Sequence, residues 1–372
     1  MSTREDWLYT EERLLPVAAS MGQLLMRIRP HISARLIDGP EWERLLDRAH
    51  ETPVTMAAFP FGFEIPLQDP LPKADFGVSL VGDSRTAAHF QERGRAGDAD
   101  PSTAGLAWLL DETDREDSLL RRVAGRKMML EYDVQPVQNG ARPDPGIFLY
   151  PVDDVLAGGQ QRISELGAVY DALVFAGGWS PDAAERRQVE RLYETMTPDT
   201  LIKAVGTFPS RERTIRTAAT GFRKADDVVA FLDRAGWPGC PSAVGDTVSF
   251  FEERGAFAYL GIHFDITADG VGPALGLSFF AQEREWLKDI RYWTPLIDGI
   301  GERAYALPGK LAELARWSTG STTLLTGSGP IMLVRGIHHV KLSITGDRVG
   351  PVKGYVFFLM MCARPKGAAA PG

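Results

Sequence analysis

The sequence predicts an α+β fold: a ten-stranded antiparallel β-barrel of five ααββ units, with the helices outside and a ligand chamber in the lumen. The order helix, helix, strand, strand recurs five times along the 372 residues, at intervals of roughly 55–75 residues. Short connections link the two strands of each pair, which makes them antiparallel. Closing the ten-stranded sheet removes both exposed edges, and a barrel of this width has a lumen that its own side chains do not fill.

The composition is that of an ordinary globular protein, with 44% hydrophobic and 24% charged residues. A net charge of −8 argues against a general nucleic-acid binder, which would carry a basic surface. The N-terminus is polar, no apolar run approaches about 18 residues, and Cys240 and Cys362 make no disulfide framework. We therefore expect a cytoplasmic protein without nucleic-acid or membrane partners, with one domain over residues 1–362 and a disordered tail over 363–372.

The first two units each show helical patterns followed by two strand-like runs. Apolar residues at three- and four-residue spacing predict the helices, with Pro16 marking a break in the first and Pro40 opening the second. Turn-forming residues separate the strands, as in Gln68–Lys73 between the first two. The expected ranges are Trp7–Ile32, Pro40–Ala49, Phe61–Leu67 and Ala74–Gly82, then Ser84–Glu92, Ala104–Ala124, Arg126–Val134 and Gly146–Val152.

The last three units repeat this order, and capping residues mark several of their helix ends. Ser180 is expected to cap a helix that has Pro181 at its first position, and Gly236 and Gly255 stand just past two helix C-termini. Asp269-Gly270 predicts the turn of the fourth strand pair. The expected ranges are Arg162–Phe175, Ser180–Thr195, Thr200–Thr207 and Thr214–Phe222, then Ala225–Ala235, Ser242–Arg254, Ala256–Ile266 and Gly272–Ala281, and finally Glu283–Ile300, Pro308–Trp317 and the strands within Ile331–Met360.

The last stretch, Ile331–Met360, predicts a hairpin with its turn at Thr345-Gly346-Asp347, and the alternation of its side chains defines a polar face. The same alternation gives the lumen-facing side of the other strands. We expect the lumen to be lined by His339, Lys341, Ser343, Lys353 and Tyr355 from this hairpin, by Tyr259, Gly261, His263, Gly276 and Ser278 from the fourth pair, and by Glu64, Ser79, Lys203 and Arg216 from earlier strands. On the third strand the phase is open: either Lys127 with Glu131, or Tyr132, faces inward.

Four or five cations would thus converge inside a protein that is acidic overall. Cations in a cavity lose hydration and need a counter-charge. An anionic ligand such as a diphosphate is the simplest partner, because Lys supplies point charges, Arg a bidentate fork, and Tyr and His neutral donors.

In these features the chain resembles the ABBA-type aromatic prenyltransferases (PT barrels), and in element order the resemblance covers nearly its whole length. It rests on Lys353-Gly354-Tyr355, which matches the Lys-x-Tyr pattern of that family, on Lys341 in the partner strand and on Glu64 in the first strand. The resemblance implies transfer of a prenyl group from an allylic diphosphate donor to an electron-rich aromatic small molecule or peptide. It implies no required cofactor, although Mg²⁺ assists some members.

The resemblance also implies a role for each candidate residue. Diphosphate binding would fall to Lys127, Lys203, Arg216, Lys341, Lys353 and Tyr355, catalysis and uptake of the ring proton to Glu64 and His339, and contact with the substrate and allyl cation to Tyr259, His263 and Phe280. His263 is equally consistent with a structural role. The middle strand pairs depart from the family pattern, because Lys203 and Arg216 are followed two residues later by Val205 and Ala218 instead of tyrosine.

Two other functions fit parts of this pattern: a non-catalytic barrel that binds a small molecule or peptide, and a hydrolase or isomerase that uses His339 and Glu64 without a diphosphate. No metal site is expected at His338-His339, because adjacent strand residues point to opposite faces. Asp153-Asp154 and Asp226-Asp227 lack the DDxxD continuation of magnesium-dependent terpenoid enzymes, and no P-loop or Cys-x-x-Cys motif is present.

Overall fold

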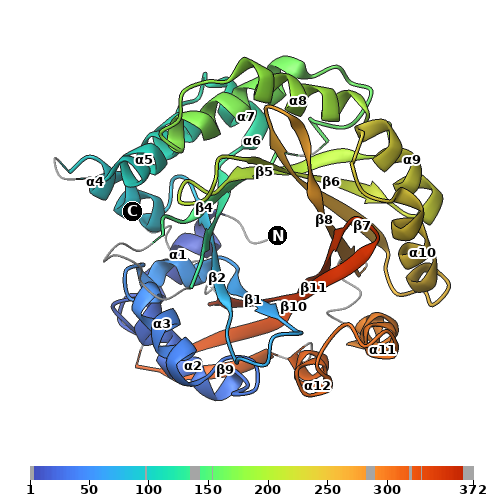
Figure 1. Ribbon diagram of the computed structural model, residues 1–372. Helices are drawn as coiled ribbons and strands as arrows, with labels where there is room; N and C mark the ends of the chain where they lie inside the picture. Colours follow the sequence, from blue (N-terminus) through green and yellow to red (C-terminus); the bar gives the residue numbers. More distant parts are fainter. Residues whose placement is uncertain are drawn as a thin grey trace.

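The computed structural model describes residues 4–96, 99–134, 143–152, 154–281, 290–317, 321–327 and 329–362. Eleven strands in these ranges form one antiparallel sheet, and ten of them close into a ring surrounded by helices (Figure 1). The ring follows chain order from β1 to β8 and is completed by β10 and β11. The strands are β1 (Phe61–Pro66), β2 (Asp75–Val81), β3 (Lys127–Tyr132), β4 (Gly146–Leu149), β5 (Leu201–Thr207), β6 (Ile215–Phe222), β7 (Tyr259–Thr267), β8 (Gly270–Phe280), β9 (Ser321–Thr326), β10 (Gly329–Thr345) and β11 (Arg348–Met361).

Helices cover the outer face of the ring, as the recurring element order predicts (Figure 1). They are α1 (Arg4–Leu14), α2 (Met21–Ile28), α3 (Gly39–Ala49), α4 (Arg85–Gly94), α5 (Pro101–Asp114), α6 (Leu119–Ala124), α7 (Ile163–Ala176), α8 (Ala183–Glu194), α9 (Ala225–Ala235), α10 (Pro241–Glu252), α11 (Thr294–Glu302) and α12 (Pro308–Trp317), with short 3₁₀ turns at Arg29–His31, Val54–Ala58 and Ile290–Trp293. Among the described residues, none of these helices combines the length and the apolar character that a membrane crossing needs.

The hydrophobic core lies between the ring and the helices, on the outward face of each strand. On β7, Leu260, Ile262 and Phe264 are fully buried, whereas the alternate residue His263 is only partly buried because it faces inward. Each fully buried side chain of this size contributes about 1.5–3 kcal/mol relative to an exposed one. Burial of the outward face therefore fixes the register of the strands, and with it the set of side chains that reach the lumen.

The ring closes between its first and last strands. β11 pairs antiparallel with β1, so that Glu64 lies directly opposite Tyr355, and β11 also pairs with β10 through the turn at Gly346-Asp347. In Figure 1 the N-terminal strands β1 and β2 lie beside the C-terminal strands β10 and β11. The predicted closure, with the terminal hairpin beside Glu64, is confirmed.

Several helix starts differ from the sequence prediction because a local cap determines them. The helical stretch expected over Trp7–Ile32 is interrupted around Pro16, as the sequence predicts, and its second helix, α2, begins where the side chain of Ser20 accepts from a backbone N–H. The long helix expected in the second unit also divides, with Ser118 capping α6. α8 begins later than predicted, because Asp182 and not Ser180 caps it, with Oδ1 accepting two backbone N–H groups at 2.8 and 3.1 Å.

An eleventh strand, β9, lies outside the ring and was not predicted. β10 is 17 residues long, and its C-terminal part pairs with β8 while its N-terminal part, Gly329–Val334, pairs with β9. β9 therefore covers an edge that the longer β10 would otherwise expose. Of the helix expected over Glu283–Ile300, residues 283–289 lie outside the described residues, as does the tail expected over 363–372.

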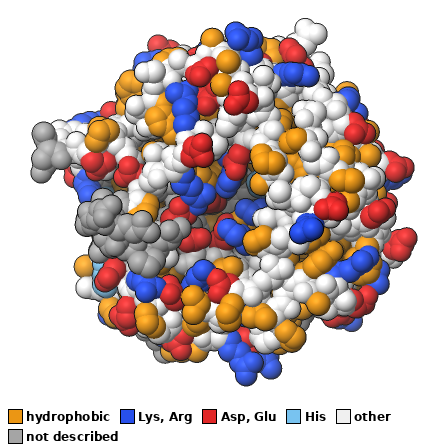
Figure 2. Space-filling model, in the orientation of Figure 1, with side chains coloured by type: hydrophobic (Ala, Val, Ile, Leu, Met, Phe, Trp, Pro, Cys, Tyr) orange, Lys and Arg blue, Asp and Glu red, His pale blue; other side chains and the backbone are white. Residues whose placement is uncertain are grey.

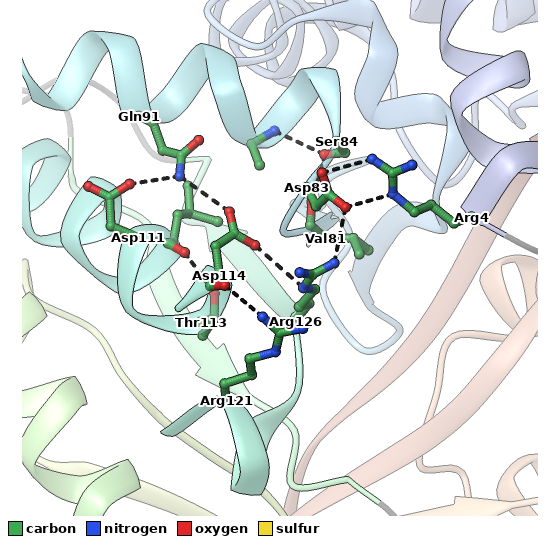
Figure 3. Close-up of polar contacts among 12 residues, drawn as sticks. Arg4, Val81, Asp83, Ser84, Gln91, Asp111, Thr113, Asp114, Arg121 and Arg126 are labelled. Carbon is green, nitrogen blue, oxygen red and sulfur yellow. Dashed lines mark hydrogen bonds and ion pairs between the residues drawn. The ribbon is translucent and has the colours of Figure 1, made fainter. Parts of the chain in front are cut away.

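A network of charged side chains joins the first two units on the outside of the barrel (Figure 3). Asp83, in the loop after β2, accepts hydrogen bonds from Arg4 at 2.6 and 2.8 Å and from Arg126 at 3.0 Å. The Arg4 hydrogen bond is the main reason that the pKa of Asp83 lies below its ordinary value. Gln91 of α4 donates to Asp111 of α5 at 2.8 Å. These contacts are largely exposed, so each contributes only about 0.2–1 kcal/mol.

Lys310 attaches α12 to the strand connection that follows β1, and its removal gives a first prediction. Its ammonium group donates to the carbonyl oxygens of Pro66 and Leu71 at 2.9 and 2.6 Å, and the residue is 4% exposed. Lys310→Met keeps the apolar stem but leaves both carbonyls without this donor. We expect a loss of about 1–3 kcal/mol in the free energy of unfolding, measured by urea denaturation. Arg316→Met, at an exposed position of the same helix, is the control. If Lys310→Met lowered the free energy of unfolding by less than Arg316→Met does, the proposed role of Lys310 would be contradicted.

Candidate active site

The inner face of the barrel is lined by the polar and small residues that the alternation predicts. Tyr259, His263 and Phe280 are partly buried, while the intervening aliphatic residues are fully buried on the outside. On β3, Lys127, Met129 and Glu131 face inward and Tyr132 is buried outside, which decides between the two phases left open by the sequence. Figure 2 shows a hollow at the middle of the face seen in Figure 1, with acidic and basic side chains gathered at it.

Glu64 lies at the centre of a charged group inside the barrel. Lys353 and Tyr355 each donate a hydrogen bond to its carboxylate, and Lys341 Nζ lies 3.8 Å from Oε2. The side chains of Glu64 and Lys341 are only 14% and 12% exposed, and that of Lys353 is 30% exposed. We call these four residues the Glu64 cluster. Their side chains come from β1, β10 and β11, so closure of the barrel assembles the cluster.

The charges of the Glu64 cluster stabilise one another. Burial alone would raise the pKa of Glu64, but Lys341 and Lys353 and the two hydrogen bonds lower it from 4.5 to about 2. Burial would likewise lower the pKa of Lys353, but the Glu64 carboxylate raises it above its ordinary value. Burial and the Glu64 charge raise the pKa of Tyr355 well above 10. At neutral pH the cluster therefore holds an anion, a cation at Lys353 and a neutral phenol donor.

Four rings form a continuous stack beside this cluster. Tyr259 stacks on Phe280 with ring centres 4.8 Å apart, Phe280 on His339 at 5.0 Å, and His339 on Tyr355 at 4.0 Å. Lys341 Nζ lies 4.7 Å from the centre of the Tyr355 ring. We call these four rings the aromatic wall. Because Tyr355 belongs to both groups, cationic and aromatic surfaces meet in one chamber.

Two of the three histidines in this region are in contact because the strand is irregular. The prediction that His338 and His339 point to opposite faces is wrong: a β-bulge between Ile337 and His339 shifts the register, and their Nδ1 atoms lie 2.7 Å apart. Nε2 of His339 is buried without a hydrogen-bond partner among the described residues. His263 Nε2 lies 3.0 Å from Ser278 Oγ. Burial lowers the pKa of both His339 and His263 well below 6.5, so both are neutral.

Arg216 faces the lumen as predicted, but it is already paired. Its Nε and Nη2 donate to the two oxygens of Asp265 at 2.7 and 2.8 Å, across the β6–β7 pair. Arg211 is paired in the same way with Asp133 and lies over the Phe208 ring, which Arg216 also contacts. Asp265 lies two residues after His263 on β7, on the same inward face, so the alternation of side chains would have identified it as a lumen residue. Arg211 lies between strands, where no periodic signal exists.

The remaining predicted diphosphate ligands, Lys127 and Lys203, are not part of the Glu64 cluster. Lys127 is exposed, and its ammonium group lies 5.8 Å from the centre of the Tyr150 ring. Lys203 is also exposed and lies at a β-bulge between Ile202 and Ala204. A bulge interrupts the two-residue alternation of side chains between the faces of a strand. The direction of the Lys203 side chain therefore cannot be inferred from its neighbours on β5.

Two further carboxyl groups lie in the chamber and were given no role by the sequence. Asp75 is opposite Glu64 on β2 and accepts a hydrogen bond from the Val134 N–H at 2.9 Å. Burial and the charge of Glu64 raise the pKa of Asp75 to about 6 and that of Glu131 to about 7. Together with Glu64 and Asp265 they offset most of the cationic charge. The sequence predicted that the lumen cations need an anionic ligand as their counter-charge. This expectation is corrected, because carboxylates of the protein itself provide much of the counter-charge.

This arrangement can bind a ligand that is anionic at one end and apolar or aromatic at the other. Lys341, Lys353 and Tyr355 provide hydrogen-bond donors and positive charge, and the aromatic wall provides a surface that attracts cations and rings. Within the described ranges, no group of three or more His, Cys, Asp and Glu side chains has a geometry that could hold a metal ion.

Comparison with known proteins identifies the fold. No protein-family model matches the chain, and no curated protein matches it in sequence. The solved structure of the prenyltransferase PriB in its apo form superposes with a TM-score of 0.51 at 12% identity, covering 92% of this chain and 96% of PriB. AnaPT from Neosartorya fischeri gives 0.48 at 10% identity, covering 97% of this chain and 95% of AnaPT. 5-Dimethylallyltryptophan synthase from Streptomyces coelicolor gives 0.47 at 13% identity, covering 92% and 97%. The chain thus has the barrel fold of PriB, in agreement with the predicted PT barrel.

Proposed function

We propose that this protein is an aromatic prenyltransferase, which transfers an allylic prenyl group from its diphosphate to an electron-rich ring of an indole, a phenol or a peptide side chain. The observation that carries the proposal is the contact between the Glu64 cluster and the aromatic wall inside the barrel. The likeness of the fold to that of PriB is consistent with this proposal.

The reaction needs two surfaces, and the chamber offers both. Lys341 and Lys353 would stabilise the negative charge of the departing diphosphate, with Tyr355 as a neutral donor. Arg216 lies in the same lumen and would be a further ligand if its pairing with Asp265 is shared with the diphosphate. The allyl cation formed by ionisation would be shielded by the rings of Tyr259 and Phe280.

Bond making and proton transfer complete the proposed cycle. The C–O bond of the donor breaks and its electron pair leaves with the diphosphate, after which the aromatic ring attacks the allyl carbon. The ring then loses the proton at the attacked carbon to a carboxylate or imidazole in the chamber. Glu64 and His339 are the groups that the sequence suggests for this step, and both lie at the chamber.

The proposal is tested by donor binding followed by turnover. Dimethylallyl, geranyl and farnesyl diphosphates are each added in a thermal-shift experiment, with EDTA and with Mg²⁺ in parallel to establish whether magnesium contributes. We expect at least one donor to raise the melting temperature and to support prenylation of tryptophan or of a phenol. No stabilisation by any donor would overturn the proposal.

Substitution of the two lysines is expected to reduce turnover strongly. Lys341→Ala and Lys353→Ala each remove a positive charge from the site of the leaving group, and we expect kcat/KM to fall by about 10²-fold or more. Arg348→Ala removes a positive charge from an exposed position on the same strand as Lys353 and serves as the matched control. Equal effects of Arg348→Ala and Lys353→Ala would contradict the assignment.

A second function, a non-catalytic barrel that binds a small molecule or peptide, is favoured by one observation. Lys353 and Arg216 are already paired with Glu64 and Asp265, so the lumen is close to neutral without a diphosphate. For such a protein we would expect no donor-dependent thermal shift, and the same thermal-shift series therefore separates the two functions.

A further inference from the structure

We propose that Glu131, and not Glu64, accepts the proton that the aromatic ring loses, while Glu64 serves as a fixed anion that holds Lys341, Lys353 and Tyr355 in place. The inference rests on the proposed prenyl transfer and identifies the residue that completes it. It also gives separate roles to the two glutamates of the chamber.

The position of Glu131 leaves room for a ring beside its carboxyl group. Its neighbours across the sheet are Gly77 on β2 and Gly146 on β4. The Phe208 ring fills the space beside Gly146, so the room lies on the Gly77 side. A Cβ built on Gly77 would meet no atom within 4 Å, so open space lies next to Glu131 on the lumen side. Glycine at such a position allows a ligand to approach the strand closely.

The hydrogen bonds of the two glutamates differ. Glu64 accepts from Lys353 and Tyr355 and has Lys341 Nζ at 3.8 Å, so its proton-accepting oxygens are occupied. Glu131 makes no hydrogen bond or ion pair with the described residues, although it is only partly buried and faces the same chamber. A base must be within hydrogen-bond reach of the proton it removes. Asp75 already accepts from the Val134 N–H, whereas both oxygens of Glu131 are without a partner among the described residues.

The electrostatic surroundings of the two glutamates lead to the same assignment. Burial and the negative charge of Glu64 raise the pKa of Glu131 to about 7, which suits a group that exchanges a proton near neutral pH, whereas the pKa of Glu64 is lowered to about 2. The charged and titratable groups that act on Glu131 or are acted on by it are Glu64, Lys341, Arg216, Arg211, Lys353, Tyr355 and Tyr150.

The proton balance of the step is simple. The new carbon–carbon bond forms as the ring attacks the allyl carbon, and the diphosphate keeps the electron pair of the broken C–O bond. The proton at the attacked ring carbon passes to Glu131, and the C–H electron pair restores the aromatic ring. Glu131 then returns its proton to water through the chamber. No oxidant or further reactant is needed.

Glu131→Gln tests the proposal, with an acceptor deuterated at the reacting carbon as the decisive probe. In the unmodified protein we expect the prenylation rate to rise with pH through about 7, because the base must be deprotonated. In Glu131→Gln we expect the rate to fall by about 10²-fold or more, the rise near pH 7 to disappear and a primary isotope effect of roughly 2 or more to appear. Donor-induced thermal stabilisation should persist, and the melting temperature should not fall, because a neutral amide relieves repulsion from Glu64.

The outcomes separate the two levels of inference. If the unmodified protein turns over and Glu131→Gln keeps its rate, its pH profile and an isotope effect near one, the role of Glu131 is overturned and the proposed function stands. If Glu64→Gln abolishes the rise near pH 7 and Glu131→Gln does not, the roles are reversed and the proposal is again overturned. Absence of prenylation by the unmodified protein, with any donor, overturns the proposed function and this role with it.

Discussion

Glu64→Ala is expected to lower the free energy of unfolding by about 3–5 kcal/mol, because it removes the counter-charge of two largely buried lysines. Lys353 loses its hydrogen-bond acceptor and Lys341 loses the carboxylate 3.8 Å away, while the low exposure of Glu64 and Lys341 limits compensation by water. Tyr355 also loses its acceptor. Urea denaturation at pH 7, followed by tryptophan fluorescence, measures the loss directly.

The control for Glu64→Ala is an ion pair of the same charge type on the surface. Glu313 pairs with Arg316 on α12 at 2.7 Å, and the arginine side chain is 74% exposed. Glu313→Ala should therefore change stability by at most about 0.5 kcal/mol. The double variant Glu64→Ala/Lys353→Met should recover part of the loss, because it also removes one of the unpaired cations. If Glu64→Ala were no more costly than Glu313→Ala, the cluster would not be electrostatically coupled.

The pH dependence of this effect has a defined direction. The pKa of Glu64 is 4.5 in an unfolded chain and about 2 in the folded protein, so its ionisation stabilises the fold fully above pH 4.5. This contribution is lost as the pH falls toward 2. The difference in stability between the unmodified protein and Glu64→Gln should therefore shrink as the pH falls below 4.5, as measured by urea titrations at each pH.

The second large effect is expected from a single methyl group at the closure of the barrel. A Cβ on Gly62 of β1 would overlap the carbonyl oxygen of Val356 on β11, a backbone atom that cannot rotate away. Gly62→Ala must therefore push the two closing strands apart, and we expect a loss of about 3 kcal/mol. Thermal and urea denaturation of the purified variant measure it.

Gly77→Ala is the matched control, since Gly77 lies directly opposite Gly62 on the neighbouring strand β2. A Cβ there meets nothing within 4 Å, so the substitution should change stability by no more than about 1 kcal/mol, in the stabilising direction if anything. Equal losses for Gly62→Ala and Gly77→Ala would show that glycine flexibility, and not contact with Val356, explains the first result.

The sequence was sufficient to predict the fold and the centre of the site because both depend on periodicity. Alternation identified Glu64, Lys341, Lys353 and Tyr355 as inward, and the need to remove sheet edges placed the last hairpin beside the first strand. Which face of β3 points inward could not be predicted from the sequence. One face carries Lys127 and Glu131 and the other carries Tyr132, so each face has a polar group.

The sequence could not predict which side chains pair across neighbouring strands, or where a β-bulge interrupts a strand. The partner of Arg216 depends on the β6–β7 register, which places Asp265 opposite it. The contact between His338 and His339 depends on a β-bulge that breaks the two-residue period. The partial neutrality of the lumen follows from such pairings, so counting cations alone overestimated its positive charge.

The closure between β1 and β11 also determines when the site forms during synthesis. Tyr355 and Glu64 are 291 positions apart in the chain, so the cluster cannot assemble until β11 has left the ribosome. Until then, β1 presents an unpaired edge that other nascent chains can bind, as exposed strand edges commonly do. A chain that stops before β11 would lack both the cluster and the cover for this edge. Premature termination within the last strand is therefore expected to give insoluble protein instead of a weakly active enzyme.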